Sequence, residues 1–164
     1  SLKGTNSTCF LTGLTLLDDD QQSATYITTD HIMPNCTSSQ NFKSVLNNKS
    51  SGVFNGRTIV REDSQKTNSK QSNKNLLLSD KATMNSNPQL EIYADDVKCA
   101  HGSTTGALDN EALFYMQSRG LDRKSASSLL IRGFVTELME EIENKDLRDY
   151  LFNKFDNWLI KNNQ

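Results

Sequence analysis

The two side chains best suited to binding a metal ion are Cys99 and His101, which stand two residues apart in the sequence. Alternate residues of an extended strand point to the same face, so a thiolate and an imidazole at this spacing can reach one metal ion. Two ligands do not complete a tetrahedral site, and no third Cys or His is close by in the sequence. Spacing alone therefore leaves two interpretations open: a metal site completed from elsewhere, or a small buried cysteine beside a solvated histidine.

The other reactive side chains do not form a recognisable catalytic arrangement. Cys99 and His101 on one strand cannot easily align sulfur, imidazole and an orienting acid, as a nucleophilic cysteine requires. The run Asp18–Asp20 lacks the alternating acidic pattern of a calcium-binding loop, so we interpret it as a solvated turn. Asp95 and Asp96 also favour a turn, and the sequence contains no glycine-rich phosphate-binding motif. We therefore expect a protein that is not an enzyme.

An acidic cluster lies near the C-terminal end of the sequence. Its members are Glu137, Glu140, Glu141 and Glu143. Such a cluster is typical of the solvated face of a helix, and a contact with a basic partner is the alternative.

The composition argues against several kinds of partner and location. The 164 residues carry 18 Lys and Arg against 20 Asp and Glu, a net charge of −2, which is not the basic balance of a nucleic-acid-binding protein. No apolar run approaches the length of about 18 residues that a membrane span needs, and no signal-peptide pattern opens the sequence. Three widely spaced cysteines argue against a disulfide framework, so we predict a cytoplasmic protein. The first residue is Ser1 rather than Met, and we expect a fragment of a longer chain.

Residues 1–108 contain short strand-like runs separated by turn residues. Around Leu90, Ile92 and Ala94, apolar and more polar residues alternate with the period of two that is typical of a half-buried strand. The predicted strands are Cys9–Leu17, Ala24–Thr28, Phe42–Leu46, Val53–Val60, Leu76–Leu78, Leu90–Ala94 and Val97–His101. The predicted turns are Asp18–Asp20, Pro34–Asn35, Asn47–Asn48, Asn55–Gly56, Asn87–Pro88 and Asp95–Asp96.

Two β architectures suit this spacing: a two-sheet sandwich or barrel, and a solenoid in which short strands stack coil on coil. Hydrophobic residues make up 35 % of the chain, which is little for a wide sandwich core but enough for the narrow interior of stacked coils. The polar segment Gln71–Asn75 would place amide side chains in register between coils, as in asparagine ladders. We therefore predict a β-solenoid.

The periodicity becomes helical after Leu108. Asp109 and Asp122 are suitable N-caps, and Gly120 is a suitable residue to follow a helix that ends at Arg119. Two apolar stripes with a spacing of four residues follow: Ala126, Leu130, Phe134, Leu138 and Ile142, and then Leu147, Leu151, Phe155 and Leu159. We predict a β-solenoid at 1–108 and a helical region at 109–164, whose helices pack on one another and on the last coil.

Three segments in this sequence are long and distinctive: Gln71–Ser79 (QSNKNLLLS), Pro88–Gly102 (PQLEIYADDVKCAHG) and Leu113–Gly120 (LFYMQSRG). Together they closely resemble the SufB/SufD family of iron–sulfur cluster assembly proteins, and they are more similar to its SufD branch than to its SufB branch. The similarity is strong from about Gly52 to Gly133. Because the family has an N-terminal helical region and further β coils, the resemblance implies that this chain is a C-terminal fragment.

The resemblance also implies a fold and a function. The expected fold is a right-handed parallel β-helix, a single-stranded solenoid, followed by a C-terminal α-helical region. The expected function is a scaffold on which iron–sulfur clusters are built and transferred. A SufB-like paralogue would bind through the β-helix and a SufC-like ABC-type ATPase through the C-terminal helices.

Site residues follow from the resemblance as well. Cys99 and His101 become candidate ligands of iron or of a nascent cluster, shared with a partner chain, while the isolated fragment holds no cofactor. Tyr115, Arg119 and Gly120 are candidate SufC contacts. An aromatic residue and an arginine four residues apart on one helix face are typical of binding hot spots, and core packing of Tyr115 is the alternative.

Three further expectations complete the sequence-based view. A carbohydrate-binding or carbohydrate-active β-helix is the alternative function, although such enzymes need clustered acids, bases or calcium ligands that the sequence does not show. An exposed strand edge would allow a homodimer of the fragment. Cys9 and Cys36 lie in weakly matching sequence, and we expect them to be small buried residues.

Overall fold

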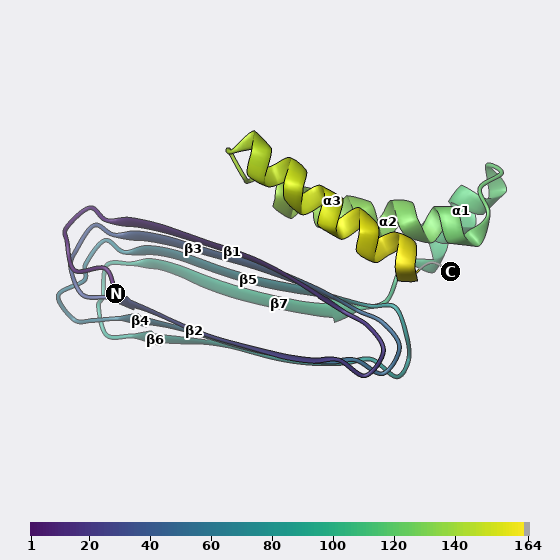
Figure 1. Ribbon diagram of the computed structural model, residues 1–164. Helices are drawn as coiled ribbons and strands as arrows, with labels where there is room; N and C mark the ends of the chain where they lie inside the picture. Colours follow the sequence, from purple (N-terminus) through teal and green to yellow (C-terminus); the bar gives the residue numbers. More distant parts are fainter. Residues whose placement is uncertain (163–164) are drawn as a thin grey trace.

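The computed structural model describes residues 1–162, so Asn163 and Gln164 at the end of the predicted helical region lie outside the described residues. In the described chain, seven strands are followed by three helices (Figure 1). Every pairing between these strands is parallel. The predicted fold class, a parallel β-solenoid with C-terminal helices, is confirmed, and the sandwich alternative is wrong.

The strands form two sheets, and each coil of the solenoid contributes one strand to each sheet. The first sheet contains β1 (Thr8–Leu17), β3 (Thr37–Leu46), β5 (Asn68–Leu77) and β7 (Lys98–Gly106), in that order. The second sheet contains β2 (Gln22–His31), β4 (Ser51–Val60) and β6 (Thr83–Ile92). Equivalent positions in the first sheet are 29, 31 and 30 residues apart, as the register of Thr8, Thr37, Asn68 and Lys98 shows.

Each predicted run overlaps an observed strand, but most strands extend further into polar sequence. The strand predicted where β5 lies is Leu76–Leu78, preceded by the polar ladder predicted at Gln71–Asn75, whereas the observed strand begins at Asn68 and buries Ser69, Gln71 and Asn73. A polar side chain can be buried in this way when it is hydrogen-bonded to a neighbouring coil. Hydrophobicity therefore underestimates the length of these strands.

Two of the predicted turns are wrong. Asn55–Gly56 lies in the middle of β4, and Asn87–Pro88 lies within β6. Gly56 serves close packing rather than turning, since a Cβ there would lie 2.5 Å from Gln71 Nε2 and 2.8 Å from the Phe54 ring. Pro88 is tolerated because β6 is the last strand of its sheet in the described chain, where a missing N–H need not cost a ladder bond.

The corners of the coils use left-handed backbone conformations. Asn6, Asn35 and Lys66 precede strands of the first sheet with φ of 60°, 58° and 59°, and Asp19 and Asn48 follow such strands with φ of 53° and 52°. Asn and Asp tolerate these angles better than most residues because their short side chains hydrogen-bond to the nearby backbone. Repeated Asn and Asp at the corners thus accommodate the repeated change of chain direction.

Asp18 is buried, which corrects its interpretation as part of a solvated turn. Its Oδ1 accepts hydrogen bonds from Nδ2 of Asn47 at 3.2 Å and of Asn48 at 2.8 Å. These two residues belong to the corresponding corner of the next coil, so Asp18 ties two corners together. Asp19 and Asp20 are exposed, as predicted.

The three helices are α1 (Asn110–Ser118), α2 (Arg123–Met139) and α3 (Lys145–Asn162). Asp109 accepts a hydrogen bond from the Glu111 N–H and Asp122 accepts one from the Ser125 N–H, which confirms both predicted N-caps. Gly120 has φ of 95° and follows the C-cap Arg119, as expected. The strands end at Gly106 and α1 begins at Asn110, while the division into separate regions at residues 108 and 109 stays a prediction.

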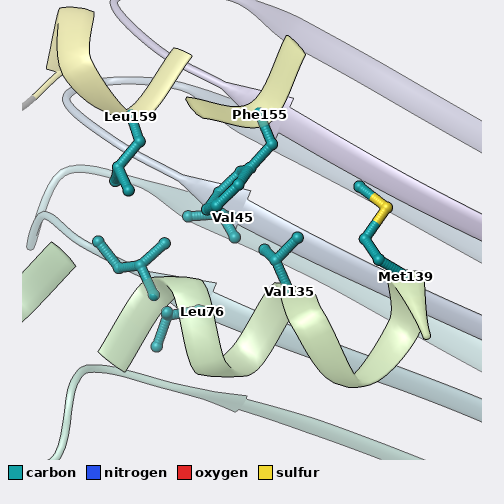
Figure 2. Packing of buried hydrophobic residues seen from close by; sticks show 7 residues of the cluster. Val45, Leu76, Val135, Met139, Phe155 and Leu159 are labelled. Carbon is teal, nitrogen blue, oxygen red and sulfur yellow. The ribbon is translucent and has the colours of Figure 1, made fainter. Parts of the chain in front are cut away.

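Helices α2 and α3 pack against the outer face of the first sheet. One buried cluster contains Val45, Leu76, Ile131, Val135, Met139, Phe155 and Leu159 (Figure 2). On α2 the predicted stripe is partly displaced by one residue: Ile131 and Val135 are buried, whereas Leu130 and Phe134 are half-buried. On α3, Leu147 is 49 % exposed. The sheet therefore decides which helix positions are covered.

Glu137, the member of the acidic cluster that lies on α2, is exposed, as the solvated-face interpretation predicts, and it also binds this chain's own sheet. Its Oε2 accepts a hydrogen bond from Lys43 Nζ at 2.6 Å, and its Oε1 accepts one from Lys74 Nζ at 3.3 Å. The side chain of Lys43 is fully buried, and its Nζ also donates to the Phe134 carbonyl at 2.6 Å. The hydrogen bond from Lys43 lowers the pKa of Glu137 below its usual value, and the hydrogen bond from Lys74 lowers it further by a smaller amount.

Candidate metal site

The last coil of the described solenoid is open. The first sheet has four strands and the second has three, so β7 has no opposing strand in its own coil within residues 1–162. β7 pairs with β5 on one side, and almost all of its residues are exposed. An exposed strand edge of this kind can pair with a strand of another chain.

Cys99 and His101 lie on β7 at this open end. They pair in register with Ser69 and Gln71, both of which are buried in the interior of the preceding coil. Paired residues of neighbouring strands point to the same face of a sheet, so the two side chains face the interior side of the last coil. The structure thus places the predicted pair together on one face, with Cys99 half-buried and His101 exposed.

The environment of Cys99 favours a protonated thiol in the absence of metal. Partial burial raises the pKa of the Cys99 thiol, and a hydrogen bond from the Ser69 backbone opposes this effect. A metal ion that binds the sulfur has to displace the proton.

The pair is incomplete as a metal site within the described chain. Residues 1–162 contain no group of three or more His, Cys, Asp and Glu side chains that could hold a metal ion. Because a metal or cluster iron is usually held by about four ligands, two or more ligands would have to come from another molecule.

The remaining cysteines lie elsewhere in the solenoid. Cys36 is fully buried, and its Sγ contacts the Gly4 carbonyl at 3.2 Å. Cys9 is half-buried on β1, in the same register row as Ser38 and at the opposite end of the sheet from β7. Neither thiol is paired in a disulfide.

The predicted partner contacts lie on the surface of α1. Tyr115 is 60 % exposed, so its alternative interpretation as a core residue is wrong. The Arg119 guanidinium lies 5.3 Å from the centroid of the Tyr115 ring, which is a cation–π distance. Phe114 beside them is 74 % exposed, and Gly120 ends the segment. The result is an exposed aromatic and cationic surface at one end of the helical region.

Apart from the ladder predicted at Gln71–Asn75, sequence reasoning missed the buried polar residues inside the solenoid. Gln40 and Gln71 are buried and hydrogen-bonded to each other, and His31 is buried against Ser38. The amide-rich segment that includes Gln71 was the one signal for such a ladder. Nothing in the spacing of Gln40 and Gln71, or of His31 and Ser38, marks either pair as neighbours, because the members of each pair belong to different strands.

No helix in residues 1–162 is long and apolar enough to cross a membrane.

These features define a class of protein: a parallel β-solenoid with two sheets, a helical region packed on one sheet, and a terminal strand that presents a cysteine and a histidine. The family model described as "SUF system FeS cluster assembly, SufBD core domain" matches residues 1–134. The chain belongs to this SufB/SufD family.

Individual relatives agree with the family match. The chain is 37 % identical over 147 residues to the iron–sulfur cluster assembly protein SufD of Escherichia coli, covering 90 % of this chain and 35 % of that protein. It is 38 % identical over 138 residues to the SufBD family protein slr0076 of Synechocystis, covering 84 % and 30 %. It is 41 % identical over 105 residues to the chloroplastic protein ABCI7 of Arabidopsis thaliana, covering 64 % and 22 %. The chain thus spans about a third or less of these relatives.

Proposed function

We propose that this protein is a scaffold component of iron–sulfur cluster assembly and that it acts in a complex with a SufB-like paralogue and a SufC-like ABC-type ATPase. The observation that carries the proposal is the Cys99–His101 pair on an exposed terminal strand of a SufB/SufD-family solenoid. In this proposal the protein assembles the site and is not itself an enzyme. A cytoplasmic location remains part of the prediction.

In this proposal Cys99 and His101 are ligands of iron or of a nascent cluster, which is the cargo of the complex. A neutral imidazole can bind iron directly, whereas the Cys99 thiol, whose pKa is raised, loses its proton as the metal binds. Iron–sulfur clusters generally take four ligands, mostly thiolates, so the partner supplies the rest. An incomplete pair at the end of a solenoid suits a site that forms only at a seam between two chains.

The SufB-like paralogue is proposed to dock on the open last coil. β7 offers an unpaired edge in the described chain, and the interior face of its coil is uncovered. A second solenoid that adds its own strands there would continue the sheets and bring its side chains to Cys99 and His101. Occupation of this edge by a second copy of the same chain is the competing outcome.

The SufC-like ATPase is proposed to dock on α1. Tyr115 and Phe114 provide exposed aromatic area, and Arg119 adds a forked cation held over the Tyr115 ring. Aromatic residues and arginine dominate binding hot spots because they bury large area and make directed contacts. Gly120, with φ of 95°, ends the helix beside this surface and directs the chain toward α2.

Membership of the SufB/SufD family supports the assembly function over the carbohydrate alternative.

The ligand role is tested by a His101→Ala substitution in the co-expressed complex with the SufB-like and SufC-like partners. We expect complex formation to be unchanged, because His101 is exposed, and the yield of reconstituted cluster to fall at least tenfold. Absorbance and iron content measure the yield. Thr104→Ala, an exposed position on the same strand, is the matched control. A normal cluster yield from a fully assembled His101→Ala complex would contradict the ligand role.

The ATPase contact is tested by Arg119→Ala. Loss of a hot-spot arginine is expected to weaken binding of the SufC-like partner by about 1–2 kcal/mol, or about five- to thirtyfold. Isothermal titration calorimetry measures the affinity, and thermal unfolding checks that the fold is intact. Lys161→Ala, an exposed cation on α3, controls for loss of charge. Equal affinities for Arg119→Ala and the unmodified chain would move the docking surface elsewhere.

A further inference from the structure

Inside the solenoid, the amides of Gln40 and Gln71 form a chain of hydrogen bonds that runs toward β7. Gln40 Nε2 donates to Oγ1 of Thr29 at 2.9 Å and of Thr58 at 3.1 Å. Gln71 Nε2 then donates to Gln40 Oε1 at 2.9 Å. Because the amide nitrogen of Gln71 points to the preceding coil, its amide oxygen is directed toward the last coil.

This oxygen lacks a partner in the described chain. Gln71 is 3 % exposed, and its Oε1 is a buried acceptor without a hydrogen bond among residues 1–162. Its amide is also confined, since a Cβ at Gly56 would lie 2.5 Å from Gln71 Nε2. A buried acceptor without a donor is costly, and a tightly held one is well suited to receive a hydrogen bond from a specific neighbour.

His101 occupies the register position next to Gln71 on β7. Neighbours in register lie about 4.8 Å apart and point to the same face, which brings the imidazole within reach of the amide oxygen. A neutral imidazole carries one N–H donor and one free nitrogen. A histidine that binds a metal through one nitrogen commonly donates its other N–H to a fixed acceptor, which sets the tautomer and the ring orientation.

We propose that Gln71 is the positioning residue for His101. When the exposed imidazole of His101 turns toward it, Oε1 of Gln71 accepts a hydrogen bond from one ring nitrogen, which leaves the other ring nitrogen unprotonated and directed toward the open end. Gln71 does not touch the metal. The proposal rests on the proposed ligand role of His101. It explains how the imidazole is held in the one tautomer and orientation that can bind a metal.

The contact itself is tested without metal, by NMR of the ring nitrogens of His101. The chain has 2 histidines, so a His31→Gln variant assigns the signals. We expect one tautomer to dominate in the unmodified chain and in Gln71→Glu, which keeps an acceptor oxygen. The new carboxylate can be accommodated, because the amide of Gln40 can turn over and donate to it. The hydroxyls of Thr29 and Thr58 then donate to Oε1 of Gln40.

In Gln71→Met, which removes the acceptor at similar volume, we expect a mixture of both tautomers. Lys70→Met, an exposed and outward-facing position on the same strand, is the matched control and should leave the tautomer unchanged. An unchanged tautomer in Gln71→Met would overturn the proposal. Loss of the single tautomer in Gln71→Glu, despite its retained acceptor, would overturn it as well.

The consequence for iron is measured in the complex with the SufB-like and SufC-like partners. Removal of the group that hydrogen-bonds a metal ligand typically lowers metal affinity or activity about tenfold or more. We therefore expect Gln71→Met to lower the cluster yield about tenfold and Gln71→Glu to keep most of the yield. A full yield from Gln71→Met would overturn the positioning role. A full yield from His101→Ala would instead refute the ligand role, while the tautomer measurement would still decide whether Gln71 binds His101.

Discussion

The imidazole of His31 lies inside the solenoid with 0 % exposure. Its Nε2 is 2.8 Å from Ser38 Oγ, and Nδ1 has no hydrogen-bond partner among the described residues. Burial lowers the pKa of His31, and the nearby carboxylate of Asp30 offsets this only in part because Arg61 already binds it. His31 is therefore an interior residue whose surroundings disfavour its protonated form.

A pH dependence of stability follows from this lowered pKa. The unfolded chain takes up a proton at His31 near the ordinary value of 6.5, whereas the folded chain does so only at lower pH. The free energy of unfolding should therefore be at its full value above about pH 6.5 and fall as the pH drops from there toward the folded pKa. The slope from one such group is at most about 1.4 kcal/mol per pH unit.

Urea denaturation between about pH 8 and about pH 5 measures this effect. His31→Gln keeps a polar side chain near Ser38 and cannot take up the proton, so its stability should depend less on pH than that of the unmodified chain. Parallel curves for the two proteins would show that burial of His31 does not control acid sensitivity.

At the scale of elements, Glu137 on α2 forms two ion pairs with the first sheet, one with Lys43 on β3 and one with Lys74 on β5. The buried side chain of Lys43 on β3 reaches Glu137 and the Phe134 carbonyl on α2, and its Nζ lies 4.7 Å from the centroid of the Phe134 ring. The Glu137 side chain is 61 % exposed, so water screens part of the attraction. The pair nevertheless neutralises a cation that has no access to solvent, and it fixes α2 over the sheet.

A comparison of how much two substitutions lower the free energy of unfolding tests this role. Glu137→Gln leaves the buried ammonium of Lys43 without its carboxylate and should destabilise the protein by about 2 kcal/mol. That is less than the range of about 3–5 kcal/mol for breaking a fully buried pair, because Glu137 is solvated. Lys43→Met removes the buried charge at similar length and should cost less.

Urea denaturation of both variants gives the comparison, and Glu140→Gln at the C-cap of α2 is the control for loss of a negative charge. If Lys43→Met were the more damaging change, the hydrogen bonds and the ring contact of Lys43 would outweigh the cost of burying its charge.

At the scale of the whole molecule, the solenoid presents one open end, and the backbone of β7 defines how another chain can add to it. The Lys98 N–H donates to the Thr67 carbonyl at 2.8 Å, toward β5. Backbone N–H groups of successive strand residues point to opposite sides, so those of Cys99, His101 and Ser103 point away from β5. The unpaired backbone groups thus line the free edge of β7, and the side chains of the candidate ligands lie on the interior face beside that edge.

Ser103→Pro should weaken assembly with the SufB-like partner. Proline removes one outward N–H and its ring obstructs a docking strand, while the bonds from β7 to β5 are kept, so we expect about a tenfold loss of affinity. Size-exclusion chromatography of co-expressed chains and titration of purified ones measure it.

Ser103→Ala controls for the lost hydroxyl contact with Ser86, which is 2.8 Å in this structure. Equal complex formation by Ser103→Pro and Ser103→Ala would exclude strand addition at this edge. A concentration-dependent dimer of the unmodified chain would show that a second copy of the chain pairs with the edge of β7.

Local signals in the sequence were sufficient for the order of elements. Strand runs, the change to helical period after Leu108, and the caps Asp109, Gly120 and Asp122 depend on residues a few positions apart, so they can be predicted without the fold. That Cys99 and His101 face the same side can also be predicted without the fold, because it follows from the two-residue period of a single strand.

Tertiary structure alone decided which polar residues are buried and what they bind. Gln71 meets Gln40 across 31 residues, and Lys43 meets Glu137 across 94. Asp18 resembles any turn aspartate until the next coil supplies Asn47 and Asn48 as donors, and Gly56 resembles a turn until Gln71 fills the space beside it. Burial of a polar group is favourable only when its partner is in place. Those partners come from other coils and from α2, so the register of the stacked coils and the docking of the helix determine them.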